Sequence, residues 1–122
     1  MRKVLFFIFF LLFAFQHVFA QQDALIKKIN EQVWKPFIQS FNAGDDEAFK
    51  AVHSKDVIRV NRDGKEIYGY DRYFQKIPDS IKAKWSDWKK NIELRFIQRI
   101  AGNDKAFEEG YYKTTKIGRA HV

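Results

Sequence analysis

Side chains that can move a proton or hold an anion are widely spaced in this 122-residue chain. His53 follows a short expected helix, Arg59 lies within an expected strand, and Tyr68 ends the strand after it. In a pocket, an imidazole can act as a general base, a guanidinium can bind an anion, and a phenol can donate a hydrogen bond. These three residues are therefore the candidate polar residues of a binding pocket.

Each of these candidates also has a simpler structural role, which we favour. A histidine at the end of a helix lies near the last carbonyl groups, where positive charge is stabilised, and this describes His53. Arg59 alternates with Ile58 and Val60, as a residue on the solvated face of a strand does. The ring of Tyr68 can pack while its hydroxyl group stays in water. No catalytic residue is therefore assigned.

Acidic and metal-binding residues give no stronger candidate site. Glu108 and Glu109 could place a carboxylate in a pocket, but a charged strand face opposite Arg95 or Arg99 is the favoured interpretation. The chain contains no cysteine and no pair of histidines at metal-binding spacing. The sequence therefore predicts no metal site, no cofactor and no disulfide framework.

Residues 1–20 have the three-part layout of a secretory signal peptide. Arg2 and Lys3 precede an unbroken apolar run at 4–15, and Val18-Phe19-Ala20 forms a small-residue cleavage site. The apolar run is shorter than the ~20 residues that cross a bilayer. We therefore expect an exported protein, periplasmic or secreted, that contacts a membrane only through the uncleaved signal.

The mature chain begins with two helices in its sequence pattern. Asp23 can cap a helix at about 23–42, where apolar residues recur every four positions and Pro36 predicts a kink. Gly44 then ends this helix, and Asp45 caps a short second helix.

Two hairpins follow, separated by a third helix. The first hairpin is expected at 57–60 and 66–68, around a turn at Asp63-Gly64. Apolar residues at helical spacing predict the third helix at 70–88, which Pro78 either kinks or restarts. The second hairpin turns at Gly102-Asn103-Asp104. Its inner face is expected to carry Ile92, Leu94, Phe96 and Ile100, and its outer face Glu93, Arg95 and Arg99.

This order of elements, together with the segment AGDDEAFKAVHSKDVIRVNRDGKEIYGYDRYF, resembles the SnoaL-like and nuclear-transport-factor-2-like superfamily. The matching features are Gly44-Asp45 between the first two helices, Asp56 before the first strand, Gly64 in its turn and Gly69 before the third helix. The chain looks most like exported bacterial members with a domain of unknown function. The resemblance implies an α+β cone, in which a strongly curved mixed sheet wraps around a long kinked N-terminal helix.

The resemblance also implies an apolar cavity that binds a small apolar molecule. The residues expected to line it are Trp34, Phe37, Phe41, Phe74, Trp85 and Tyr112. In the steroid-isomerase type of this superfamily, a tyrosine polarises a carbonyl group and an aspartate takes the proton. The corresponding positions here fall on Phe37 and Asn61, which cannot do this chemistry. The favoured function is therefore a binding module that is non-catalytic or weakly catalytic.

Other functions stay open on the sequence. One is an isomerase- or dehydratase-type enzyme whose acid or base lies in further strands. Another is a scaffold that forms a homodimer, since members of the superfamily often pair through the open sheet face. The segment KAKWSDWKKNIELRFIQR mixes basic residues with Trp85 and Trp88, as nucleic-acid-binding surfaces do. Its basic and aromatic residues occupy different faces of the expected helix, which disfavours nucleic acid as a partner.

The end of the chain differs in character from the rest. The superfamily has two more strands after about 115, but Ile117-Gly118-Arg119-Ala120-His121-Val122 shows neither strand alternation nor a helical period. These letters correspond to the translation of a common sequencing adapter. We therefore interpret 117–122 as adapter read-through and 21–116 as a truncated SnoaL-like domain, and we exclude His121 from the candidate ligands.

Export can be tested directly. Protein recovered from the periplasm of a Gram-negative expression host is expected to begin at Gln21, because signal peptidase cleaves after a small residue such as Ala20. Intact mass and N-terminal sequencing measure this. Membrane-bound protein that still begins at Met1 would contradict the prediction.

Overall fold

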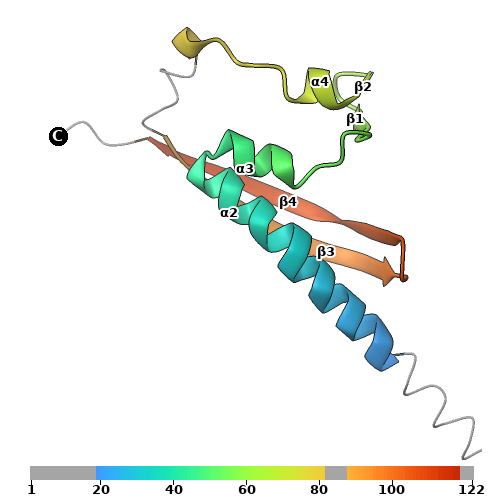
Figure 1. Ribbon diagram of the computed structural model, residues 1–122. Helices are drawn as coiled ribbons and strands as arrows, with labels where there is room; N and C mark the ends of the chain where they lie inside the picture. Colours follow the sequence, from blue (N-terminus) through green and yellow to red (C-terminus); the bar gives the residue numbers. More distant parts are fainter. Residues whose placement is uncertain (1–18, 82–87, 119–122) are drawn as a thin grey trace, which may run out of the picture. The chain divides into compact units, whose positions relative to one another are not determined.

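The computed structural model describes residues 19–81 and 88–118 and belongs to the α+β class (Figure 1). A long N-terminal helix and a short second helix precede the first hairpin, and a third helix precedes the second hairpin, as the sequence predicted. The hairpins form two separate two-stranded sheets among the described residues. The chain divides into two compact units. Among the described residues, the first contains 19–34 together with Leu94–Tyr112, and the second contains 35–81, 88–93 and 113–118.

The N-terminal helix is continuous from residue 19 to residue 43 and so begins before the expected start at 23. It contains a π-helical turn, η1 (Asn30–Trp34), followed by α2 (Lys35–Ala43). Pro36 lies just after this turn; it has no N–H to donate, and its ring crowds the carbonyl group one turn earlier. A π-helical turn is one way for a helix to accommodate such a defect. The sequence predicted a kink at Pro36, and the structure has a π-helical turn on the N-terminal side of the proline.

The end of α2 and the start of α3 follow their predicted capping signals. Gly44 has φ +68°, in the left-handed region that ends many helices. Asp45 is the N-cap of α3 (Asp46–Ala51), and its carboxylate accepts a 3.0 Å hydrogen bond from the Ala48 N–H. This contact satisfies one of the N–H groups that the first turn of a helix leaves without a partner.

The first hairpin consists of β1 (Arg59–Asn61) and β2 (Glu66–Tyr68), which pair in antiparallel register. The first strand thus begins later than the expected position at 57. Asn61 Oδ1 accepts a 3.2 Å hydrogen bond from the Gly64 N–H, and Lys65 takes the left-handed φ of +52°. Asn61 is therefore a turn residue, a role in which asparagine side chains commonly serve.

The third helix is much shorter than predicted. It consists of α4 (Tyr70–Tyr73), and a separate helical stretch begins only at 79–81. Ile77 precedes Pro78, and a proline ring disfavours helical backbone at the residue before it. The Pro78 carbonyl then accepts a 2.9 Å hydrogen bond from the Ile81 N–H. Pro78 therefore starts a new helical turn and does not kink a continuous helix.

The prediction of one helix over 70–88 is wrong at its C-terminal end as well. Strand β3 (Trp88–Ala101) begins at the residue where that helix was to end. The argument against nucleic-acid binding placed the basic and aromatic residues on different faces of a helix. It therefore does not apply to Trp88, which lies in a strand. Trp85 falls outside the described residues, so its place in a pocket stays a prediction.

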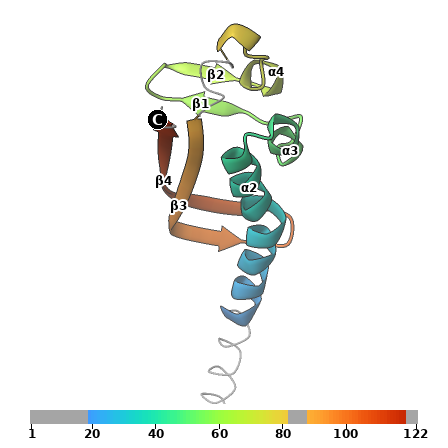
Figure 2. The same ribbon diagram turned by 90° about the vertical axis from the view of Figure 1, so that its left-hand side faces the viewer.

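Strands β3 and β4 (Ala106–Gly118) run side by side and form the second hairpin (Figure 2). The Gly102 N–H donates a 2.7 Å hydrogen bond to the Lys105 carbonyl, which closes the hairpin at the predicted turn. β4 continues to Gly118, beyond the expected boundary of the strand pattern.

Burial along β3 changes phase between Phe96 and Arg99. Phe96 is half-buried, and the next inward residues are Arg99 and Ala101, while Ile97 and Ile100 are 61% and 53% exposed. The prediction that Ile100 lies on the inner face and Arg99 on the outer face is wrong. One additional residue between two inward positions shifts the two-residue alternation of a strand, as a β-bulge does.

Gly110 of β4 lies against the backbone of β3 beside this phase change. A Cβ atom on Gly110 would lie 2.2 Å from the Arg95 carbonyl oxygen and 2.9 Å from the Phe96 Cα. Glycine within a strand often marks a bulge or a close approach of two backbones, because it has no side chain to collide. The absence of a side chain at Gly110 therefore permits the local geometry that turns Arg99 inward.

Few apolar side chains are buried in the described part of the chain. Ile92 and Ala101 are its buried apolar residues, at 7% and 6% exposure. Each has its backbone N–H bound by a carboxamide of the N-terminal helix: Ile92 donates to Asn42 Oδ1 at 2.8 Å, and Ala101 donates to Gln22 Oε1 at 3.0 Å. In each unit, a side-chain carboxamide of the N-terminal helix therefore binds the strand backbone at a buried apolar residue.

Replacing Gly110 with alanine tests the close approach of Gly110 to the β3 backbone. Gly110→Ala is expected to lower the free energy of unfolding by about 1–3 kcal/mol, because the β3 backbone must move away from the new methyl group. Gly118→Ala in the same strand is the matched control, since a Cβ there meets no atom within 4 Å. Its effect is expected to stay within about 0.5 kcal/mol. Equal small effects of both substitutions in denaturant titrations would contradict the close approach.

Candidate functional site

An aromatic cluster lies within the second unit, on α2, α3 and α4. It consists of Phe37, Phe41, Phe49, His53, Tyr73 and Phe74. Phe49 is central: its ring centroid lies 4.9 Å from that of Phe37, 6.0 Å from that of Phe41 and 6.2 Å from that of Phe74. The rings meet at tilted or edge-on angles, which aromatic pairs prefer. The cluster holds the three short helical elements of this unit together.

His53 belongs to this cluster. Its Nδ1 lies 2.8 Å from the Phe49 carbonyl oxygen, one turn earlier, which is the helix-end contact expected from the sequence. Its ring centroid lies 4.8 Å from that of Phe49, 5.0 Å from that of Phe74 and 5.4 Å from that of Tyr73. In the neutral imidazole, donation from Nδ1 to the carbonyl leaves Nε2 as an acceptor. His53 thus packs as an aromatic residue and also caps the end of α3.

The other two polar candidates, Arg59 and Tyr68, lie directly opposite each other across the first hairpin. Arg59 Nη1 donates a 2.7 Å hydrogen bond to the Tyr73 hydroxyl, and its guanidinium lies 4.7 Å from the centre of the Tyr73 ring. The Tyr68 and Tyr73 ring centroids are 6.2 Å apart. Both residues therefore attach the hairpin to α4, and the guanidinium is already engaged with a tyrosine.

The residues expected to line an apolar cavity are divided between the two units. Phe37, Phe41 and Phe74 pack within the aromatic cluster of the second unit. Trp34 belongs to the first unit, where its ring lies 5.2 Å from that of Phe96. Tyr112, also in the first unit, is 67% exposed.

A groove of about 340 Å³ lies beside the aromatic cluster, between α3 and the segment that follows α4. Its apolar wall consists of Phe49, Tyr73, Phe74 and Ile77, and its polar rim of Asp46, Glu47, Lys50, Gln75 and Lys76. Phe74 is shared with the lining predicted from the sequence. Ile77 was not among the predicted lining residues, because the sequence pattern placed it on a helix that Pro78 either kinks or restarts. Pro78 carries the signal that was available, since a proline disfavours helical backbone at the residue before it.

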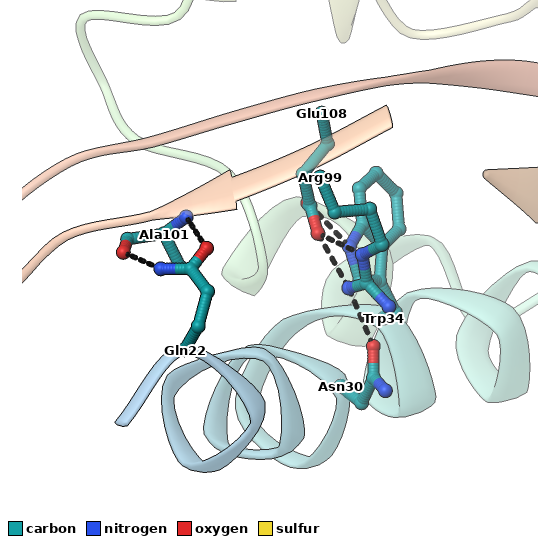
Figure 3. Close-up of polar contacts among 6 residues, drawn as sticks. All are labelled: Gln22, Asn30, Trp34, Arg99, Ala101 and Glu108. Carbon is teal, nitrogen blue, oxygen red and sulfur yellow. Dashed lines mark hydrogen bonds and ion pairs between the residues drawn. The ribbon is translucent and has the colours of Figure 1, made fainter. Parts of the chain in front are cut away.

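A second, polar site lies within the first unit and joins Asn30, Trp34, Arg99 and Glu108 (Figure 3). Arg99 Nε donates a 2.6 Å hydrogen bond to Glu108 Oε1, and the two side chains are 16% and 12% exposed. The same guanidinium donates to Asn30 Oδ1 at 2.6 Å. The Trp34 indole N–H donates to Glu108 Oε2 at 2.7 Å. We call these four residues the Arg99–Glu108 cluster.

The contacts of the Arg99–Glu108 cluster indicate a structural role. Both carboxylate oxygens of Glu108 accept hydrogen bonds, and the guanidinium of Arg99 reaches two partners, so neither group is available for proton transfer. Arg99 is one of the two arginines that the sequence placed opposite Glu108 and Glu109, but the pair lies against the helix and is mostly buried, so it is not part of an exposed charged strand face. Asn30 and Trp34 were missed as its partners. They are the first and last residues of η1, whose π-helical geometry has no recognised sequence pattern here.

Gln22 forms a second contact between the helix and the hairpin of the first unit. Its side-chain carboxamide binds both backbone groups of Ala101, accepting from the N–H and donating to the carbonyl (Figure 3). The carboxamide thus binds the two backbone hydrogen-bonding groups of Ala101, as the backbone of a neighbouring strand would.

Phe37 and Asn61, the positions at which isomerase residues were sought, have structural roles as well. Phe37 packs against Phe49 in the aromatic cluster, and Asn61 holds the first turn. Within 19–81 and 88–118, no group of three or more His, Cys, Asp or Glu side chains could hold a metal ion, and no helix is long and apolar enough to cross a membrane. No protein-family model, curated protein or solved structure matches this chain.

Removing the Glu108 carboxylate tests the structural role of the Arg99–Glu108 cluster. Glu108→Ala is expected to lower the free energy of unfolding by about 1–3 kcal/mol or more, because it removes the carboxylate that accepts hydrogen bonds from a mostly buried guanidinium and from the Trp34 indole N–H. The adjacent, exposed Glu109 supplies the control, and Glu109→Ala is expected to change stability by no more than about 0.5 kcal/mol. Similar effects of both substitutions on chemical denaturation would show that the cluster does not stabilise the unit.

Proposed function

We propose that the protein is an exported module that binds a small, largely apolar molecule in the groove beside the aromatic cluster. The groove itself is the observation that carries this proposal. Its volume of about 340 Å³ lies within the range of about 300–1,000 Å³ that is typical of small-molecule sites. Aromatic and aliphatic walls with a few polar groups at the edge are also the usual composition of such sites.

The packing of the aromatic residues that line the groove favours ligand binding. Phe49 and Phe74 form part of the groove wall and also pack against other rings of the aromatic cluster. Side chains held in this way are pre-positioned, so little ordering of the protein is required when a ligand binds.

The polar residues of the groove favour binding without catalysis. Asp46 and Glu47 lie on the exposed rim, where water competes for a carboxylate. A general acid or base usually needs a desolvated environment that adjusts its protonation to the reaction. His53, the residue best suited to proton transfer, packs in the aromatic cluster and is not among the residues that line the groove.

Two further parts of the proposal rest on the sequence. Export follows from the signal-like residues 1–20. The cone fold of SnoaL-like proteins is proposed as the finer description of the α+β class, supported by the order of elements and by the long N-terminal helix. In that description the module is a member of the superfamily that retains a binding role without the isomerase residues.

Substituting two isoleucines of nearly equal exposure tests whether the groove binds an apolar ligand. Ile77 lines it and is 40% exposed, whereas Ile81 lies in the next helical turn and is 39% exposed. Ile77→Lys is expected to raise the Kd for the fluorescent apolar probe N-phenyl-1-naphthylamine by about tenfold, since burial of an isoleucine side chain contributes about 1.5–3 kcal/mol when complete. Ile81→Lys is expected to leave the Kd unchanged.

Both variants are first compared with the wild-type protein by circular dichroism and thermal unfolding. Equal weakening by the two substitutions would place the probe elsewhere, and failure of the wild-type protein to bind any apolar probe would remove the proposed function.

A further inference from the structure

We infer that the groove selects small amphipathic anions, in particular apolar carboxylates, and that Lys76 binds the carboxylate group. This inference rests on the proposed function, since it specifies the chemical class of ligand for the same groove. It starts from the two lysines of the rim, of which one forms an ion pair and the other forms none within the described residues.

One basic residue of the rim is already neutralised. Lys50 Nζ lies 3.2 Å from Glu47 Oε1, and the two residues are one helical turn apart on α3. The Lys50 side chain is 32% exposed, so its methylene groups lie along the protein surface while its ammonium faces Glu47. This pair contributes little net charge to the groove.

Lys76 differs from Lys50. It lies in the extended segment before Ile77, lines the groove and is exposed. Within the described part of the chain, the Lys76 ammonium forms neither a hydrogen bond nor an ion pair. It is therefore a positive charge held beside an apolar wall and available to a ligand.

Other basic side chains of this unit are engaged within the protein. The Lys55 ammonium lies 3.9 Å from the centre of the Tyr70 ring, and Arg59 donates to the Tyr73 hydroxyl. Arg72 forms an ion pair with Glu66. These contacts distinguish Lys76 from its neighbours as the cation that can complement an incoming anion.

The acidic rim residues do not cancel this charge. Glu47 is paired with Lys50, and Asp46 lies in the first turn of α3, where a carboxylate interacts with the N-terminal end of the helix. A ligand with an apolar body against Phe49, Phe74 and Ile77 can therefore place a carboxylate at Lys76. Hydrogen bonds between charged partners are roughly twice as strong as those between neutral ones, which favours the anion over a neutral analogue.

Two probes that share a ring but differ in charge test the inference. Indole-3-acetate carries a carboxylate, and indole-3-acetamide replaces it with a neutral amide of similar size. Calorimetric titration of the wild-type protein is expected to give a Kd for the acetate about five- to tenfold below that for the amide. Raising the salt concentration to 1 M, where the screening length is only about 3 Å, is expected to reduce this preference.

Charge-neutralising variants assign the preference to one residue. Lys76→Gln is expected to weaken binding of the acetate until it equals that of the amide, with amide binding unchanged. Lys65→Gln is the matched control, because Lys65 is an exposed lysine in the turn of the first hairpin and does not line the groove. It is expected to retain the wild-type preference.

The outcomes separate this inference from the proposed function. Equal binding of both probes to the wild-type protein, or a preference that persists in Lys76→Gln, overturns the inference while leaving a binding groove. Loss of the preference in both Lys76→Gln and Lys65→Gln overturns it too, because the effect is then one of overall charge. Absence of binding by N-phenyl-1-naphthylamine and by both indole probes overturns the proposed function as well.

Discussion

The ion pair between Arg99 and Glu108 is the contact on which the first unit depends. Removing two charges from water is costly, and their mutual attraction compensates only when the remaining donors and acceptors are also satisfied. Asn30 supplies an acceptor for the guanidinium, and the Trp34 indole supplies a donor for the carboxylate. The helix and the hairpin are thus joined by partners that must all be present, in a unit whose buried apolar residue among those described is Ala101.

Two local departures from regular structure accompany this ion pair. The phase change in β3, permitted by the close approach of Gly110 to Arg95, turns Arg99 toward the helix. Asn30 and Trp34, the first and last residues of the π-helical turn, both contact the ion pair. A regular strand would place Arg99 in solvent, because side chains alternate between the two faces. The phase change in β3 and the π-helical turn therefore lie where the helix and the hairpin pack together in this unit.

In the second unit an irregular segment helps to form the groove. α4 ends at Tyr73 and Pro78 disfavours helical backbone at Ile77, so Lys76 and Ile77 lie in a non-helical segment beside α3. Phe49 then has two functions, since one part of the ring packs in the aromatic cluster and another lines the groove. A wall held by packed rings is pre-positioned, and Lys76 at its edge supplies the positive charge that we propose selects an anionic ligand.

The sequence by itself determined the α+β class, the order of elements, both turns and the capping at Gly44 and Asp45, because these depend on the backbone preferences of a few neighbouring residues. It offered Arg99 as one of two possible partners for Glu108 or Glu109, and the structure pairs Arg99 with Glu108. Only the tertiary structure decided which face of β3 carries Arg99. Periodicity assumes an uninterrupted two-residue repeat, whereas the shift depends on the distant Gly110. The groove could not be predicted for a similar reason, because its lining residues come from separate segments that are brought together only by folding.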